Sequence, residues 1–158
     1  MYPDSRDTES EIRVAKYLFF GRYCFPGDTQ RERSATYRGE TMNVPVWIRE
    51  LFAAIDRRDA ETFANYLTDD ATFCFGNAEP LGGREAVRAG VAGFFRSIAA
   101  LAHTIEDVWI VPGAVVLHGV VTYTRHDGSA LTVPFANVFK MRDDRILDYR
   151  IFVDASQL

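Results

Sequence analysis

From position 45 onward, the apolar residues recur with the period of an α-helix. Five of them fall on one face of a helix that begins near Pro45: Val46, Trp47, Leu51, Ala54 and Ile55. Asp59 stands where the N-cap of a second helix, 60–66, is expected. A short strand at 71–75 and a third helix at 84–101, which opens after Gly82-Gly83, complete a largely helical first half.

The last third of the chain has the pattern of a strand meander. Four runs rich in β-branched and aromatic residues cover 103–111, 114–125, 129–142 and 145–154. Short turns separate them at Pro112-Gly113, Asp127-Gly128 and Asp143-Asp144, and Asp-Gly between two such runs is a strong hairpin signal. Helices followed by a meander predict an α+β domain in which three helices pack on one face of a curved, mostly antiparallel sheet.

Residues 1–41 differ from the rest of the chain. They carry a short apolar patch at 17–20 but no sustained period, so we expect this N-terminal extension to be weakly ordered or peripheral. Gly39-Glu40 can be encoded by a purine-rich stretch of the kind that precedes bacterial start codons. Met42 is therefore a second possible start, and the domain is expected to span 42–158. An extension that packs on the domain remains the alternative.

Composition narrows the class of protein. A chain of 158 residues suits one domain with a sizeable core. The formal net charge is −4 and no basic stripe occurs, which argues against nucleic acid as a partner. The longest apolar run, 108–116, is too short to span a membrane, and no secretory signal is visible. Two cysteines do not make a disulfide framework, so a reduced cytoplasmic protein without metal or cofactor is expected.

Four motifs in this order resemble one family. They are FAAIDRRD at 52–59, LTDDATF at 67–73, GREAVR at 83–88 and FKMRDDRI at 139–146. Together they resemble the SnoaL-like and ketosteroid isomerase-like branch of the nuclear transport factor 2 superfamily, over the chain from Val44 to its end. The resemblance implies the cone-shaped, cystatin-like fold of that superfamily. It does not imply one activity, because members include isomerases, cyclases, dehydratases, epoxide hydrolases and proteins without chemistry.

The positions that carry known chemistry in this family are altered. Ketosteroid isomerase uses an aspartate base with a tyrosine and a protonated aspartate as oxyanion hole. The matching positions here are Phe75, Leu51 and Asn137. The Asp-Arg-Asp set of limonene epoxide hydrolase-like members matches Thr122, Val120 and Ile151. Neither reaction is therefore implied for this chain.

Strand alternation predicts a polar row inside an apolar concavity. Two-residue loops at 112–113 and 127–128 place His118 opposite Asp107 and opposite Asn137, and a bulge at Asp144 places Tyr149 beside Asn137. In this hypothesis Asp107 orients His118 as general acid/base, while Asn137 and Tyr149 bond a carbonyl or enolate. The expected apolar wall comprises Leu51, Phe73, Phe75, Phe95, Trp109, Val120, Phe135, Phe139 and Ile151.

A one-residue slip at either turn would send this row to the outer face. His103, at a strand end, and His126, beside a turn, receive no role. The function expected is binding of a small hydrophobic molecule, with an isomerase, cyclase or lyase reaction on an apolar carbonyl compound; a non-catalytic ligand-binding or dimerisation module is the alternative. A homodimer is expected through the outer sheet face, with Val115, Leu117, Val121, Tyr123, Val138 and Phe152 on it.

Overall fold

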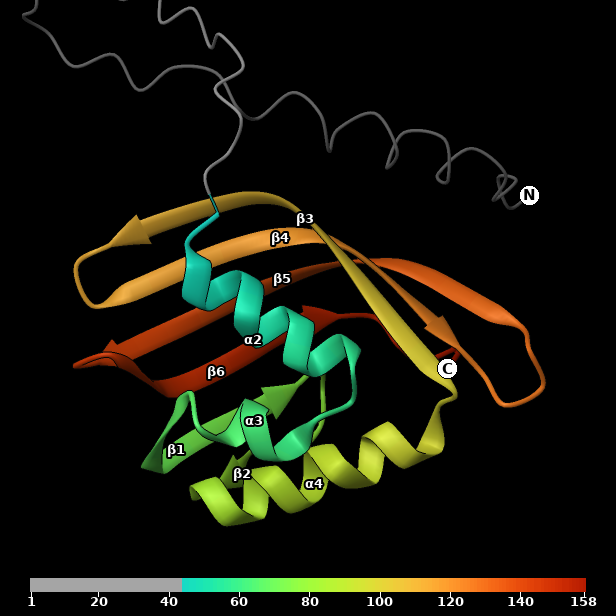
Figure 1. The fold of residues 1–158 in the computed structure, drawn as a ribbon, viewed down its shortest axis with the longest axis horizontal. Coiled ribbons are helices and arrows are strands. Elements are labelled where there is room, and N and C mark those ends of the chain that lie inside the picture. Colours follow the sequence, from blue (N-terminus) through green and yellow to red (C-terminus); the bar gives the residue numbers. More distant parts are fainter. Residues whose placement is uncertain (1–43) are drawn as a thin grey trace, which may run out of the picture. The chain divides into compact units, whose positions relative to one another are not determined.

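The computed structural model describes residues 44–158, so the expectations for residues 1–41 lie outside the described residues. Three helices and six strands follow one another in the order α2 (Val46–Asp56), α3 (Ala60–Ala64), β1 (Leu67–Phe75), β2 (Leu81–Gly82), α4 (Arg84–Ser97), β3 (Ala100–Val111), β4 (Ala114–Thr124), β5 (Ala130–Arg142) and β6 (Arg145–Val153) (Figure 1). The expected helices and long strands are confirmed. Helix α4 ends earlier than predicted, because Ile98 adopts an extended conformation that leads into β3.

The six strands form one curved sheet in the order β2-β1-β6-β5-β4-β3. Neighbouring strands are antiparallel except β1 and β6, which run parallel. Figure 1 shows α2 lying across the inner side of the sheet, with α3 and α4 beside β1 and β2. The predicted α+β arrangement, with helices on one face of a mostly antiparallel sheet, is therefore confirmed.

Helix α2 is placed by the spacing of its apolar residues. Ile48, Leu51, Phe52 and Ile55 recur at helical intervals and are all buried, so one face of the helix packs onto the sheet. The helix ends where Arg58 takes a left-handed φ of 59°. Asp59 then caps α3 by accepting a hydrogen bond from the Thr62 backbone N–H at 2.9 Å, as predicted. Asp56 is thereby held at the last turn of α2, facing β3.

The turn between β4 and β5 is one residue longer than predicted. The Arg125 N–H donates to the Ser129 carbonyl at 2.8 Å, which leaves His126, Asp127 and Gly128 as a three-residue loop. Gly128 has a φ of 84°, the left-handed position that such a loop requires. The register therefore shifts by one, and a shift of one residue exchanges the two faces of a strand.

The exchange decides which β4 residues face the helices. Val115, Leu117, Val121 and Tyr123 are buried on the inner face, although they were expected outside. Phe135 pairs with Gly119 and Asn137 with Leu117, so the predicted pairings of these residues with Val120 and His118 are wrong. The Pro112-Gly113 loop does contain two residues, and the predicted pairs Asp107–His118 and Trp109–Val116 are confirmed.

The β5–β6 turn also differs from expectation. Asp143, and not Asp144, has the left-handed φ, at 54°. The irregularity falls between Lys140 and Met141, so Asn137 pairs with Ile151 and Phe139 pairs with Tyr149. The predicted pairing of Asn137 with Tyr149 is therefore wrong, although both side chains do face the core.

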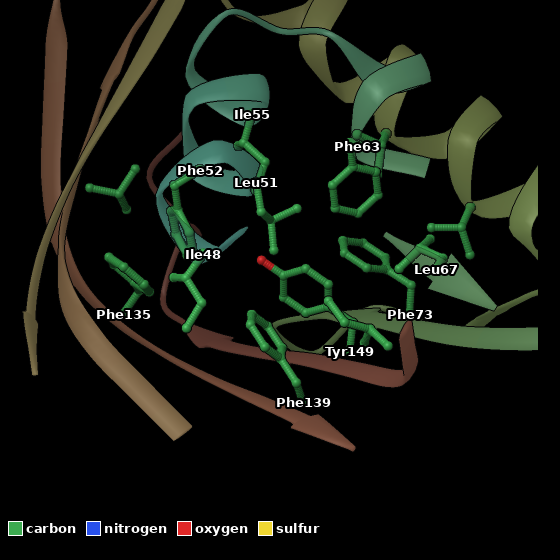
Figure 2. Packing of buried hydrophobic residues seen from close by; sticks show 14 of the residues in the cluster. Ile48, Leu51, Phe52, Ile55, Phe63, Leu67, Phe73, Phe135, Phe139 and Tyr149 are labelled. Atoms are coloured by element: carbon green, nitrogen blue, oxygen red, sulfur yellow. The ribbon is translucent and has the colours of Figure 1, made fainter. Parts of the chain in front are cut away.

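Aromatic rings fill the centre of the core (Figure 2). Tyr149 lies edge-on to Phe139 with ring centroids 4.4 Å apart, and edge-on to Phe73 at 5.3 Å. Phe63 of α3 reaches the same group and contacts Phe73 with centroids 6.0 Å apart. Such tilted and edge-on contacts stabilise the core beyond the burial of apolar area. This cluster forms one end of the site described next.

Candidate functional site

The predicted polar row is divided between the two faces of the sheet. His118 Nε2 lies 3.1 Å from Asp107 Oδ2, so the predicted pair exists. It lies on the outer face, however, with 37% of the His118 side chain exposed. The ring stacks on Trp109, and its Nδ1 lies 3.3 Å from Glu106 Oε2. The prediction that Asp107 and His118 point into the pocket is wrong, because the β4–β5 loop is longer than assumed.

Four of the expected wall residues do not line the cavity. Trp109 and Val120 belong to the outer face, and Trp109 is 52% exposed. Leu51 and Phe139 are fully buried in the core but do not line the cavity. The same register error accounts for Val120. Phe139 of β5 packs against Trp47 of α2, with ring centroids 6.2 Å apart.

A cavity with a volume of about 50 Å³ lies between the helices and the inner face of the sheet. Five predicted wall residues line it: Phe73, Phe75, Phe95, Phe135 and Ile151. The other apolar lining residues are Ile55, Phe63, Val91, Phe94, Leu101 and Val121. Four polar side chains complete the lining, namely His103, Tyr123, Asn137 and Tyr149. The cavity is thus apolar with a few polar groups, as binding sites for small molecules are.

Asn137 and Tyr149 meet inside this cavity. Asn137 Nδ2 donates a hydrogen bond to the Tyr149 hydroxyl oxygen at 2.9 Å. Burial raises the pKa of Tyr149 far above its ordinary value, with a smaller contribution from Tyr123, so the phenol keeps its proton. Burial also raises the pKa of Tyr123, to about 12. The two tyrosines that line the cavity therefore carry neutral hydroxyl groups.

The histidine of the cavity is His103. Its Nδ1 lies 2.6 Å from Asp56 Oδ1, and its backbone N–H donates to Asp56 Oδ2 at 3.2 Å. A carboxylate only accepts hydrogen bonds, so His103 Nδ1 carries a proton and donates the hydrogen bond to Asp56. Phe52 and Phe135 hold the ring edge-on, with centroids 5.0 and 5.1 Å away. Only 10% of the His103 side chain is exposed.

Sequence reasoning missed His103 and Asp56, although a signal for the correct face existed. The odd-numbered β4 residues Val115, Leu117, Val121 and Tyr123 are larger and more apolar than the even-numbered set, which includes two threonines. If these residues face inward and the loop to β5 has three residues, Asn137 and Phe135 also face inward. On β3 the same choice turns Leu101, His103 and Ile105 inward. Nothing comparable in the sequence indicates that Asp56 reaches β3.

The tyrosines of the cavity lead to a prediction for alkaline pH. A raised folded-state pKa means that the free energy of unfolding is fully retained below the ordinary tyrosine pKa of about 10 and falls as pH rises above it. In a titration followed by tyrosinate absorbance, we expect Tyr149 to ionise only as the domain unfolds. The Tyr149→Phe variant should lack that part of the absorbance change. Ionisation of Tyr149 near pH 10 in a domain that circular dichroism shows to be folded would contradict this.

No three His, Cys, Asp or Glu side chains converge on a metal-sized position within residues 44–158. In the same residues, no helix is long and apolar enough to cross a membrane. The polar side chains at the cavity form two pairs, His103 with Asp56 and Asn137 with Tyr149.

A family model for the SnoaL-like domain matches residues 48–149, more than half of the chain. The chain belongs to the SnoaL-like domain family. A search among curated proteins gives no match. Solved structures share the fold of this SnoaL-like protein at low sequence identity, so they support its architecture.

Three of these structures illustrate the range. A SnoaL-like polyketide cyclase candidate from Jannaschia sp. CCS1 is 20% identical with a TM-score of 0.63, over 70% of this chain and 84% of that one. A ketosteroid isomerase-like protein from Catenulispora acidiphila, in complex with trimethylamine, is 18% identical with a TM-score of 0.66, over 71% and 88%. An LEH-like epoxide hydrolase from M. tuberculosis is 16% identical with a TM-score of 0.60, over 69% and 80%.

Proposed function

We propose that this SnoaL-like domain binds a small, largely apolar molecule in its cavity and acts on it without a cofactor. The reaction class is isomerase, cyclase or lyase on an apolar carbonyl compound, with His103 as general acid/base and Asp56 as its partner. The observation that carries the proposal is the 2.6 Å contact between His103 Nδ1 and Asp56 Oδ1 beside the cavity. The pair replaces the one expected from the sequence, His118 with Asp107.

The chemistry follows from the arrangement of the ring. Nδ1 is engaged by Asp56, which does not line the cavity, whereas His103 does. Nε2, the other ring nitrogen, is therefore the one that we assign to the bound molecule. In the neutral ring, Nε2 takes a proton from the carbon next to the carbonyl of the bound molecule. Asp56 stabilises the imidazolium that results, and the same nitrogen returns the proton to the product. The proton balance closes without any other reactant.

The size of the cavity limits what can bind without rearrangement. Its 50 Å³ is well below the roughly 150 Å³ of a cavity that holds benzene. Phe75 and Phe94 line the cavity, are only partly buried, and contact each other with ring centroids 5.2 Å apart. Admission of a ring therefore requires these side chains to move. That a related structure holds trimethylamine, a very small molecule, fits a compact site.

Assembly as a two-fold dimer through the outer sheet face belongs to the same proposal. Val138 and Phe152 lie on that face as predicted, and Phe152 is 59% exposed. The other residues expected on this face, Val115, Leu117, Val121 and Tyr123, are core residues. The outer face instead carries Trp109, Val116 and Val120. The outer face of the sheet is therefore still rich in apolar side chains. Large exposed apolar patches are typical of interfaces.

The test uses steroid-like and polyketide-like ketones with wild type and His103→Ala. We expect His103→Ala to lower turnover by about 10²-fold or more, the size of a general acid/base contribution, while ligand binding is retained. His118→Ala is the matched control, since it removes the other histidine–aspartate pair of the domain and should leave turnover unchanged. Turnover by His103→Ala within a few-fold of wild type would contradict the proposal. Binding by wild type without turnover of any panel member would instead favour a non-catalytic ligand-binding module.

A further inference from the structure

One residue that lines the cavity has a polar atom without a partner among the described residues. Asn137 is 2% exposed, and its Oδ1 accepts no hydrogen bond within residues 44–158. The amide group of the same side chain is engaged, because Nδ2 donates to the Tyr149 hydroxyl oxygen. Burying an unpaired acceptor is unfavourable, so native proteins pair nearly all of them. An unpaired amide oxygen in the wall of a cavity therefore indicates a ligand that donates a hydrogen bond.

The neighbouring Tyr149 supplies the complementary group. Its oxygen accepts the bond from Asn137, and its own proton has no acceptor in the part of the chain that the structure describes. Figure 2 shows the hydroxyl directed away from β6 into the layer of side chains beneath α2, next to Leu51. One free acceptor and one free donor thus stand side by side, on neighbouring strands of the cavity wall.

We infer that Asn137 and Tyr149 together bind a hydroxyl group of the ligand. A hydroxyl oxygen accepts from the Tyr149 O–H while its proton is donated to Asn137 Oδ1, so both groups are satisfied at once. A carbonyl can accept from Tyr149 only, and leaves Asn137 Oδ1 unpaired. An apolar group satisfies neither. The pair therefore selects a hydroxylated molecule over its ketone or hydrocarbon counterpart.

This inference rests on the proposed function and narrows its substrate class. His103 pairs with Val121 across β3 and β4, whereas Asn137 pairs with Leu117 across β4 and β5. The two side chains are therefore four residues apart along β4, at different positions in the cavity wall. The hydroxyl anchor and the reacting carbon are thus different parts of one molecule. The substrate is a small hydroxyketone with an otherwise apolar skeleton.

The test compares three probes of matched shape: cyclopentanol, cyclopentanone and methylcyclopentane. Their dissociation constants are measured by ligand-observed NMR on the full chain and on Asn137→Leu. In wild type we expect cyclopentanol to bind about tenfold more tightly than methylcyclopentane, as one good hydrogen bond allows, and more tightly than cyclopentanone. In Asn137→Leu, cyclopentanol should lose that advantage while methylcyclopentane binds as before. Tyr149→Phe, a smaller change, should reduce the advantage in the same way if Asn137→Leu does not fold.

Three results would overturn the inference. The first is binding of the ketone as tightly as the alcohol, which is expected if Asn137 presents Nδ2 to the ligand. The second is an alcohol that keeps its advantage in both variants. The third is tighter binding of methylcyclopentane than of cyclopentanol to wild type. The first two would leave the acid/base role of His103 intact, whereas an alcohol preference combined with normal turnover by His103→Ala would refute only the proposed reaction.

Discussion

Gly119→Ala is expected to destabilise the domain by more than about 3 kcal/mol, beyond the usual range for overpacking. A Cβ at this position would lie 2.0 Å from the Thr104 carbonyl oxygen and 3.0 Å from Ile105 Cα. Both atoms belong to the backbone of β3, next to the irregularity between Ile105 and Asp107, so no side-chain rotation relieves the clash. The free energy of unfolding, measured by urea denaturation, should show the loss.

Gly93→Ala is the matched control for this prediction. Gly93 lies in the interior of α4, and its nearest neighbour to an added Cβ is the flexible end of Arg96 at 3.8 Å. Alanine is preferred to glycine in helices by up to about 1 kcal/mol, so this variant should be equally stable or more stable than wild type. Equal effects of the two substitutions would show that β3 and β4 do not approach as closely as described.

The architecture could be predicted because it depends on patterns that local chemistry enforces. The spacing of Leu51 and Ile55 requires a helix with one buried face. Asp59 begins the next helix as its N-cap, because its side chain accepts a hydrogen bond from the Thr62 N–H. The dipeptide Pro112-Gly113 admits a tight hairpin, in which Gly113 takes a φ of 76°. Each of these features is decided within a few residues, so tertiary contacts do not override it.

The faces of the strands could not be predicted with the same success, because they depend on the length of one loop. Both a two-residue and a three-residue loop use Asp127-Gly128, since Gly128 can take the left-handed conformation in either. The choice is made by burial of Leu117 and Val121, a property of the whole core. His118 therefore faces outward, contrary to the prediction. Asn137 and Tyr149 face inward as predicted, because the apolar pattern of their strands is unambiguous.

The pair of His103 with Asp56 could not be predicted from the sequence. The two residues are far apart in the sequence and meet only because α2 crosses the sheet so that its last turn faces β3. Helix crossing is set by the packing of Phe52 against Phe135 and His103, which no local pattern encodes. The pair that the sequence predicted, His118 with Asp107, lies on the outer face instead.

The orientation of β4 leads to the last prediction, a comparison of Leu117→Asp with Val116→Asp. Leu117 is fully buried on the inner face, so a carboxylate there has no partner and should destabilise the domain by about 4 kcal/mol or more, enough to prevent stable folding. Val116 is the next residue and lies on the outer face. Aspartate at this position should leave the monomer folded, with a circular dichroism spectrum like that of wild type.

The same comparison tests the proposed dimer. Val116 lies on the outer face with Trp109, its partner across β3 and β4, and a charge there opposes burial against a second copy. Sedimentation of wild type at micromolar concentration should show a dimer, and Val116→Asp should shift the population toward monomer. A stable, folded Leu117→Asp together with an unfolded Val116→Asp would restore the opposite register, with His118 inside and Tyr123 outside. A wild type that remains monomeric would refute the dimer while leaving the register of β4 as it stands.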